Sequence, residues 1–142
     1  MFSLSALLRV RPSFVDMAVT RYFSLLCLAL APGASYAASL YASQYVGTVS
    51  LLTFDESTES LSLTQSLTAC GRMPAWLTWN SATKKLYCTD ENYYSSTATI
   101  SELSAGSDMR LSVNAIANTP SGGVANVLYG GSNGAGYIAI AH

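Results

Sequence analysis

The chain has 142 residues, of which 50% are hydrophobic and only 11% are charged, and its formal net charge is −1. Residues 38–142 contain four basic and seven acidic side chains, which gives this region a net charge of −3. Because no basic patch occurs in it, we expect no nucleic-acid partner. Abundant Ser, Thr, Gly and Ala with few charges favour a folded β-protein over a disordered tail.

The N-terminal segment has the order of parts found in a secretory signal peptide. A short basic start and the uncharged, mostly apolar run 22–31 precede Ser35 and Ala37, the small residues that a signal peptidase reads. We therefore predict a signal peptide over residues 17–37, cleaved between Ala37 and Ala38, and a secreted, extracellular protein. The run is shorter than the about 20 residues that cross a bilayer, so we expect no membrane span.

Residues 1–16 lie upstream of this pattern. They contain two arginines, several Ser and Leu, and no acid before Asp16. We interpret them as an upstream extension in front of the true start at Met17, although a transit peptide would have a similar composition.

The rest of the chain repeats itself. Residues 47–91 align with residues 98–142 at a constant offset of 51 positions, and residues 40–45 resemble residues 86–91. Periods of about 40–50 residues with several short strands each are typical of propellers and other repeat arrays. The repeat therefore predicts a fold built from similar β-sheet units.

Short apolar or alternating runs between turn residues predict the β-strands of this repeat, and no helical period occurs outside the leader. Besides the opening run 40–45, the predicted strands cover residues 48–54, 61–67, 75–79, 86–89, 99–103, 111–116, 124–129 and 137–141. Grouped into four-stranded blades A-B-C-D, they form an opening B-C-D, one complete blade and a final A-B. A propeller ring takes about four to eight blades. We therefore predict an all-β propeller, with residues 38–142 as its N-terminal part of two or so blades.

Two cysteines remain after the leader, Cys70 and Cys88, because Cys27 lies within it. An even pair in an oxidising compartment favours a disulfide. This bond would tie a hairpin and stabilise the fold by about 3 kcal/mol. The alternative is two buried free thiols.

Several short segments occur in a fixed order along the chain. They are residues 40–42, 47–50 with 54–55, 86–91 and 139–142, with 74–78 as an inner strand and 121–123 as the loop before the last copy. This order resembles the lactonase-type seven-bladed propeller family, whose members typically begin with strands of the forms LYVGTY and VSVYxFD, continue with LYAVNE after a first inner strand, and reach LLVANY in the next copy.

This resemblance implies a function as well as a fold. The family includes 6-phosphogluconolactonases and fungal enzymes that cyclise 3-carboxy-cis,cis-muconate, and a secreted version with these two cysteines is similar to its extracellular, carboxymuconate-cyclase-like branch. It implies a small-molecule lactone or dicarboxylate substrate, no nucleotide cofactor, and an active site at the central channel made from a His, a Glu and arginines of later blades. None of these matches a position here, so the catalytic residues stay unassigned and the fragment alone is expected to be inactive.

Two motifs that suggest chemistry have simpler interpretations. Residues 130–134 match G-x-S-x-G, which can carry a nucleophilic serine, but no helix is predicted after them, so we expect a Gly-rich hairpin turn. His142 is the single histidine, and no further ligands stand at metal-binding spacing, so we expect no metal site. We interpret His142 as a chain end, with a channel-lining role as the alternative. No nucleotide-binding pattern and no N-glycosylation sequon occur.

Adjacent acids and paired tryptophans are interpreted from strand geometry. Asp90 and Glu91 point to opposite faces of a strand end, so they cannot act as a pair, and we expect both to be solvated. The alternative is that one of them faces the channel. Trp76 and Trp79 also face opposite sides and are expected to pack, with carbohydrate stacking as the alternative.

Arg72 and Arg110 are the candidates for clamping a substrate carboxylate outside the Lys84-Lys85 turn, and both are predicted to lie in loops. The favoured hypothesis is the N-terminal part of a secreted lactonase or cyclase. The alternative is a non-enzymatic secreted or cell-surface binding propeller, such as an adhesin or antigen, because fold does not fix function. A small independent β-domain ranks third.

Overall fold

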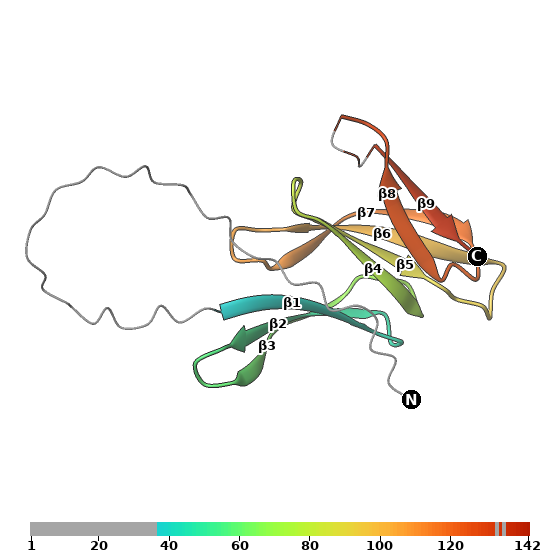
Figure 1. The fold of residues 1–142 in the computed structure, drawn as a ribbon. Helices are drawn as coiled ribbons and strands as arrows, with labels where there is room; N and C mark the ends of the chain where they lie inside the picture. Colours follow the sequence, from blue (N-terminus) through green and yellow to red (C-terminus); the bar gives the residue numbers. More distant parts are fainter. Residues whose placement is uncertain (1–36, 133, 135) are drawn as a thin grey trace, which may run out of the picture.

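The computed structural model describes residues 37–132, 134 and 136–142, and this part of the chain forms nine β-strands (Figure 1). They make three antiparallel sheets with the orders β1-β2-β3, β4-β5-β6-β7 and β8-β9. The prediction of an all-β fold is confirmed, and the sheets take the strands in the same groups as the repeat. The strands are β1 (Ala37–Gln44), β2 (Thr48–Asp55), β3 (Ser60–Thr68), β4 (Pro74–Asn80), β5 (Lys85–Asp90), β6 (Thr97–Ala105), β7 (Leu111–Pro120), β8 (Ala125–Tyr129) and β9 (Tyr137–Ala141).

The repeat is visible in backbone irregularities as well as in strand order. The β2–β3 ladder shifts register between Leu51 and Leu52, and the β6–β7 ladder shifts between Glu102 and Leu103. These two β-bulges lie 51 positions apart, which is the offset of the sequence repeat. Bulges re-aim side chains and increase twist, so the two sheets share their local shape as well as their strand order.

The sheets stack with β4 at the centre. β4 packs against β1 on one side and β8 on the other, so the first sheet lies at the bottom of Figure 1 and the β8–β9 sheet at the top right. The core lies between the first two sheets, because apolar side chains of both sheets face each other there and are removed from water. Its buried members are Tyr41, Val49, Leu51, Ala69, Cys70, Leu77, Leu86, Cys88, Leu103 and Leu111.

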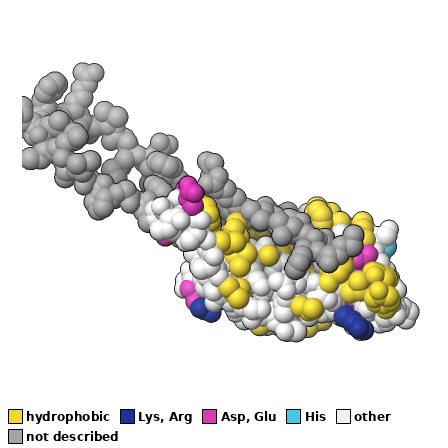
Figure 2. All heavy atoms as spheres, turned by 90° about the horizontal axis from the view of Figure 1, so that it is seen from below, with side chains coloured by type: hydrophobic (Ala, Val, Ile, Leu, Met, Phe, Trp, Pro, Cys, Tyr) yellow, Lys and Arg dark blue, Asp and Glu magenta, His cyan; other side chains and the backbone are white. Residues whose placement is uncertain are grey.

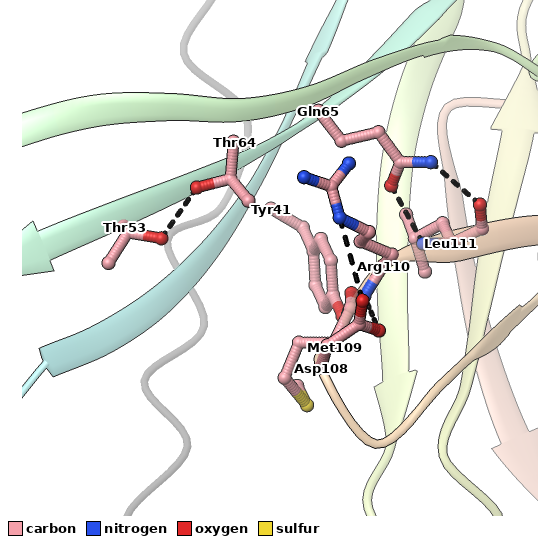
Figure 3. A network of polar contacts seen from close by, with 8 residues as sticks. All are labelled: Tyr41, Thr53, Thr64, Gln65, Asp108, Met109, Arg110 and Leu111. Carbon is pink, nitrogen blue, oxygen red and sulfur yellow. Dashed lines mark hydrogen bonds and ion pairs between the residues drawn. The ribbon is translucent and has the colours of Figure 1, made fainter.

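Hydrogen bonds also join the first sheet to the second (Figure 3). The Gln65 side chain on β3 forms two hydrogen bonds with the backbone of Leu111 on β7. The Leu111 N–H donates to Oε1 at 2.7 Å, and Nε2 donates to the Leu111 carbonyl at 2.9 Å. The Tyr41 hydroxyl donates to the Met109 carbonyl at 2.7 Å. Burial, and secondarily the Asp108 carboxylate, raise the pKa of Tyr41 to about 12, so the hydroxyl stays a donor at neutral pH.

Replacing Gln65 with alanine should weaken this contact between sheets. The change removes two hydrogen bonds and leaves the N–H of buried Leu111 without its acceptor, so we expect a loss of about 1–3 kcal/mol in the free energy of unfolding. Thr64→Ala is the matched control, because Thr64 bonds to Thr53 within its own sheet at 2.7 Å. Urea denaturation of the intact protein measures both. An equal effect of the two variants would contradict a role for Gln65 between sheets.

The C-terminal strands are exposed and carry no charge. Residues 111–141 contain no Asp, Glu, Lys or Arg, yet Val113 and Ile116 on β7 and Val127 on β8 are exposed. Soluble proteins usually protect such strands with charges, prolines or a covering element. The composition is therefore that of sheets which pack against further sheets.

Candidate functional site

One end of the stacked sheets gathers loops from all three of them. Because the strands are antiparallel, the connections after β1, β3, β5 and β7 leave at the same edge, where β9 also ends. We name this end the loop face and define it as residues 45–47, 69–73, 91–96, 121–124 and 142. In Figure 2 the right-hand end of the molecule shows yellow, magenta and cyan side chains close together, the colours of hydrophobic residues including tyrosine, of acids and of histidine.

A buried carboxylate organises the centre of the loop face. Asp90, at the end of β5, is only 2% exposed, and its Oδ1 accepts the backbone N–H groups of Met73 at 2.7 Å and Arg72 at 3.2 Å. Gly71 leaves the space for it, since a Cβ there would lie 2.2 Å from the carboxylate carbon. The expectation that Asp90 is solvated is therefore wrong: two backbone donors take the place of water. Asp90 holds the 69–73 loop.

A disulfide fixes the same loop from its other side. Cys70 and Cys88 are bonded, with their Cα atoms 5.8 Å apart, so the prediction of this bond and of a tied β4–β5 hairpin is confirmed. The N–H groups of Ala69 and Cys70 both donate to the Gly47 carbonyl, at 3.0 and 3.2 Å. A covalent bond and the β1–β2 turn therefore position residues 69–73 together with Asp90.

Glu91 connects three loops. Its N–H donates to the Met73 carbonyl at 2.8 Å, and its carbonyl accepts the N–H of Gly122 at 2.6 Å. Its half-buried side chain accepts the Tyr45 hydroxyl on Oε2 at 3.2 Å. Desolvation first, and then this carboxylate, raise the pKa of Tyr45. The Glu91 side chain is thus more exposed than that of Asp90, as strand alternation predicts, but it is not fully solvated.

The two candidate arginines lie at opposite ends of the sheets. Arg72 is exposed in the loop face, between β3 and β4. Arg110 lies between β6 and β7 at the other edge, where its Nε is 3.5 Å from an Asp108 carboxylate oxygen. Both are loop residues, as predicted, but they cannot form one clamp on the same substrate.

His142 and the serine motif are also at opposite ends. The exposed His142 ring lies in the loop face, with Nδ1 3.0 Å from the Ser121 carbonyl. Among the described residues, no three His, Cys, Asp or Glu side chains come close enough to hold a metal ion. The G-x-S-x-G segment 130–134 lies in the turn between β8 and β9, with positive φ at Gly130 and Gly131. It is a glycine-rich hairpin turn, as predicted; its residue 133 lies outside the described part.

The two tryptophans face opposite sides of β4. Trp79 packs against the core with its ring 5.5 Å from that of Tyr41. Trp76 is exposed and its indole N–H donates to Thr78 at 3.2 Å. Packing is therefore confirmed for Trp79, and the face of Trp76 stays open to other contacts.

The predicted leader lies outside the described residues, except for its last position. Ala37 and Ala38 are the first residues of β1 and pair with Asp55 and Phe54. The cleavage site and the extension 1–16 stay predictions. Within residues 37–132, 134 and 136–142, no helix has the length and apolarity to cross a membrane.

A comparison with protein families identifies the fold. The family model described as Lactonase, 7-bladed beta-propeller matches residues 36–142. The chain belongs to this family. The nine strands of the described part form the early blades of such a propeller. Comparison with the curated proteins and with the solved structures returned no match.

Sequence reasoning missed two features of this lactonase-family loop face. One is the anchoring of the 69–73 loop by Asp90. Gly71 was the available signal for it, since a glycine can mark a place where another group comes close to the backbone. The other is the gathering of Tyr45, Tyr93 and Tyr94, which come from loops almost 50 residues apart in the sequence. The alignment of residues 40–45 with 86–91 placed these loops after equivalent strands.

Proposed function

We propose that this chain forms the first blades of a secreted propeller enzyme that makes or opens a lactone. The observation that carries the proposal is the family match over residues 36–142, together with a loop face held rigid by Asp90, Glu91 and the disulfide. The chemistry would be attack of a substrate carboxylate on an activated double bond, or hydrolysis of a sugar lactone. Either uses general acid–base groups and cations that hold carboxylates.

In this proposal the described blades support the site and later blades complete it. Arg72 is the cation of the loop face available to a substrate carboxylate. The acid, the base and the other cations would come from blades beyond those described, so residues 38–142 alone should be inactive.

The test is an assay of the secreted full-length protein on 3-carboxy-cis,cis-muconate and on 6-phosphogluconolactone. We expect turnover of one of the two, and none by residues 38–142 alone. The matched control is Arg110→Ala, which lies at the far end and should leave turnover unchanged, whereas Arg72→Ala should raise KM. No turnover of either substrate by the full-length protein would remove the proposal and favour a non-enzymatic binding propeller.

A further inference from the structure

Three exposed tyrosines and one carboxylate lie together on the loop face. Tyr45, Tyr93 and Tyr94 are 48%, 55% and 73% exposed. The Tyr45 hydroxyl donates to Glu91, which joins the β1–β2 turn to the β5–β6 loop. The Tyr93 and Tyr94 rings are 4.3 Å apart between centroids, and their hydroxyls are 3.0 Å apart.

The backbone holds this tyrosine cluster in place. Glu91 is fixed at both its N–H and its carbonyl, as described above. The loop that follows is closed by the Asn92 side chain, which donates to the Thr97 carbonyl at 2.9 Å, and by the Ser95 N–H, which donates to the Asn92 carbonyl at 3.1 Å. A site that is ordered before its ligand arrives loses little conformational entropy on binding.

Glu91 gives the cluster one negative charge. In the described part of the chain, ion pairs join Lys85 to Glu102 and Arg110 to Asp108, and none joins a cation to Glu91. Arg72 is exposed on the same loop face, in the 69–73 loop. The pKa of Tyr93 is raised, first by its hydrogen bond with Tyr94, then by desolvation and by the nearby Glu91 charge. The faces of aromatic rings are also negative, so the rings and the carboxylate attract the same kind of ligand.

We propose that Tyr45, Glu91, Tyr93 and Tyr94 form a binding site for an organic ammonium ion that carries methyl groups. Methyl groups contact the apolar ring faces while the diffuse positive charge interacts with the rings and with Glu91. A hard metal ion would need several oxygen ligands, and the cluster has one carboxylate. At these four residues a carboxylated ligand would be repelled by Glu91, whereas the proposed function assigns a substrate carboxylate to Arg72 in the 69–73 loop. This ligand class differs from the anionic substrates of the proposed function, so the two proposals stand independently.

The chain contains a matched control for this site. Tyr129 and Tyr137 form a second tyrosine pair at the other end of the molecule, with ring centroids 5.6 Å apart and exposed fractions of 52% and 65%. Their sequence neighbourhood, residues 111–141, contains no acid. This pair has comparable exposed rings without the carboxylate.

The test is a titration of the full-length protein, labelled with ¹³C in its tyrosine rings, with tetramethylammonium chloride followed by NMR. Sodium chloride at equal ionic strength and methyl glucoside are the reference ligands. We expect saturable shifts of the Tyr45, Tyr93 and Tyr94 signals with tetramethylammonium alone. Glu91→Gln and Tyr93→Leu should each weaken binding by about two- to five-fold, and Tyr137→Leu should not change it.

Three outcomes would overturn the proposal. Equal shifts of the Tyr129 and Tyr137 signals would mean that any exposed ring binds the ion. Saturable binding of methyl glucoside in place of tetramethylammonium would assign the rings to a neutral sugar. If Glu91→Gln bound tetramethylammonium with unchanged affinity, the Glu91 carboxylate would not be part of the site. Turnover of the lactone substrates and binding of tetramethylammonium are measured in separate experiments, so either proposal can fail while the other is still tested.

Discussion

Gly71→Ala is expected to destabilise the protein by about 3–5 kcal/mol, whereas Gly122→Ala should cost only about 1–2 kcal/mol. The two glycines occupy equivalent positions, 51 residues apart in the repeat, and both have positive φ, +45° and +82°. A Cβ at Gly71 would overlap the Asp90 carboxylate, whereas at Gly122 no atom lies within 4 Å. In both variants the alanine is strained by a left-handed backbone conformation, but only Gly71→Ala also displaces a buried carboxylate from its two N–H donors. Urea denaturation of the intact protein measures the difference.

The repeat explains this asymmetry and provides its control. The residue equivalent to Asp90 in the next copy is Ala141, which has no carboxylate to displace. Adding Asp90→Ala to Gly71→Ala should therefore cost less than the sum of the two single changes, because both remove the same contact. Additive effects, or equal losses for Gly71→Ala and Gly122→Ala, would show that Asp90 does not hold the loop.

Removing the disulfide should lower the free energy of unfolding by about 3 kcal/mol. Cys70 and Cys88 enclose a loop with a sequence separation of 18, and both side chains are buried in the core between the first two sheets. The Cys70→Ala, Cys88→Ala double variant and the reduced wild-type protein should have the same urea midpoint, well below that of the oxidised protein. A reductant should not change the midpoint of the double variant. If the oxidised and reduced proteins unfold at the same midpoint, the bond contributes nothing to stability.

Strand centres could be predicted from the sequence, and strand ends could not. The alternating or apolar runs at residues 48–54 and 75–79 lie within β2 and β4, because those side chains face buried layers. β1 starts at Ala37 and β7 continues to Pro120, past the predicted run that stops at residue 116. Ala, Ser and Asn at these ends have little strand preference, and pairing with β2 and β6 decides their conformation.

The candidate site was less accessible to sequence reasoning, because burial of a polar side chain depends on distant segments. Whether Asp90 meets water is decided by the 69–73 loop, some 18 residues earlier. Arg72 and Arg110 were both predicted to lie in loops. Three antiparallel strands, β4 to β6, separate the two loops, so they lie at opposite edges of the sheet. The disulfide was predictable because, of the three cysteines, only Cys70 and Cys88 follow the predicted leader, and two cysteines allow only one pairing.

The Cys70–Cys88 bond also changes how the chain would respond to a pulling force. Residues 71–87, which include all of β4, lie inside a covalent ring, so tension applied at the two ends of the chain passes through the sulfur atoms instead of through them. A protease cut in the exposed turn 81–84 would likewise leave the two pieces attached. The part of the chain inside this ring, β4 with the first residues of β5, should therefore resist extension, and it should stay attached to both flanking sheets after nicking.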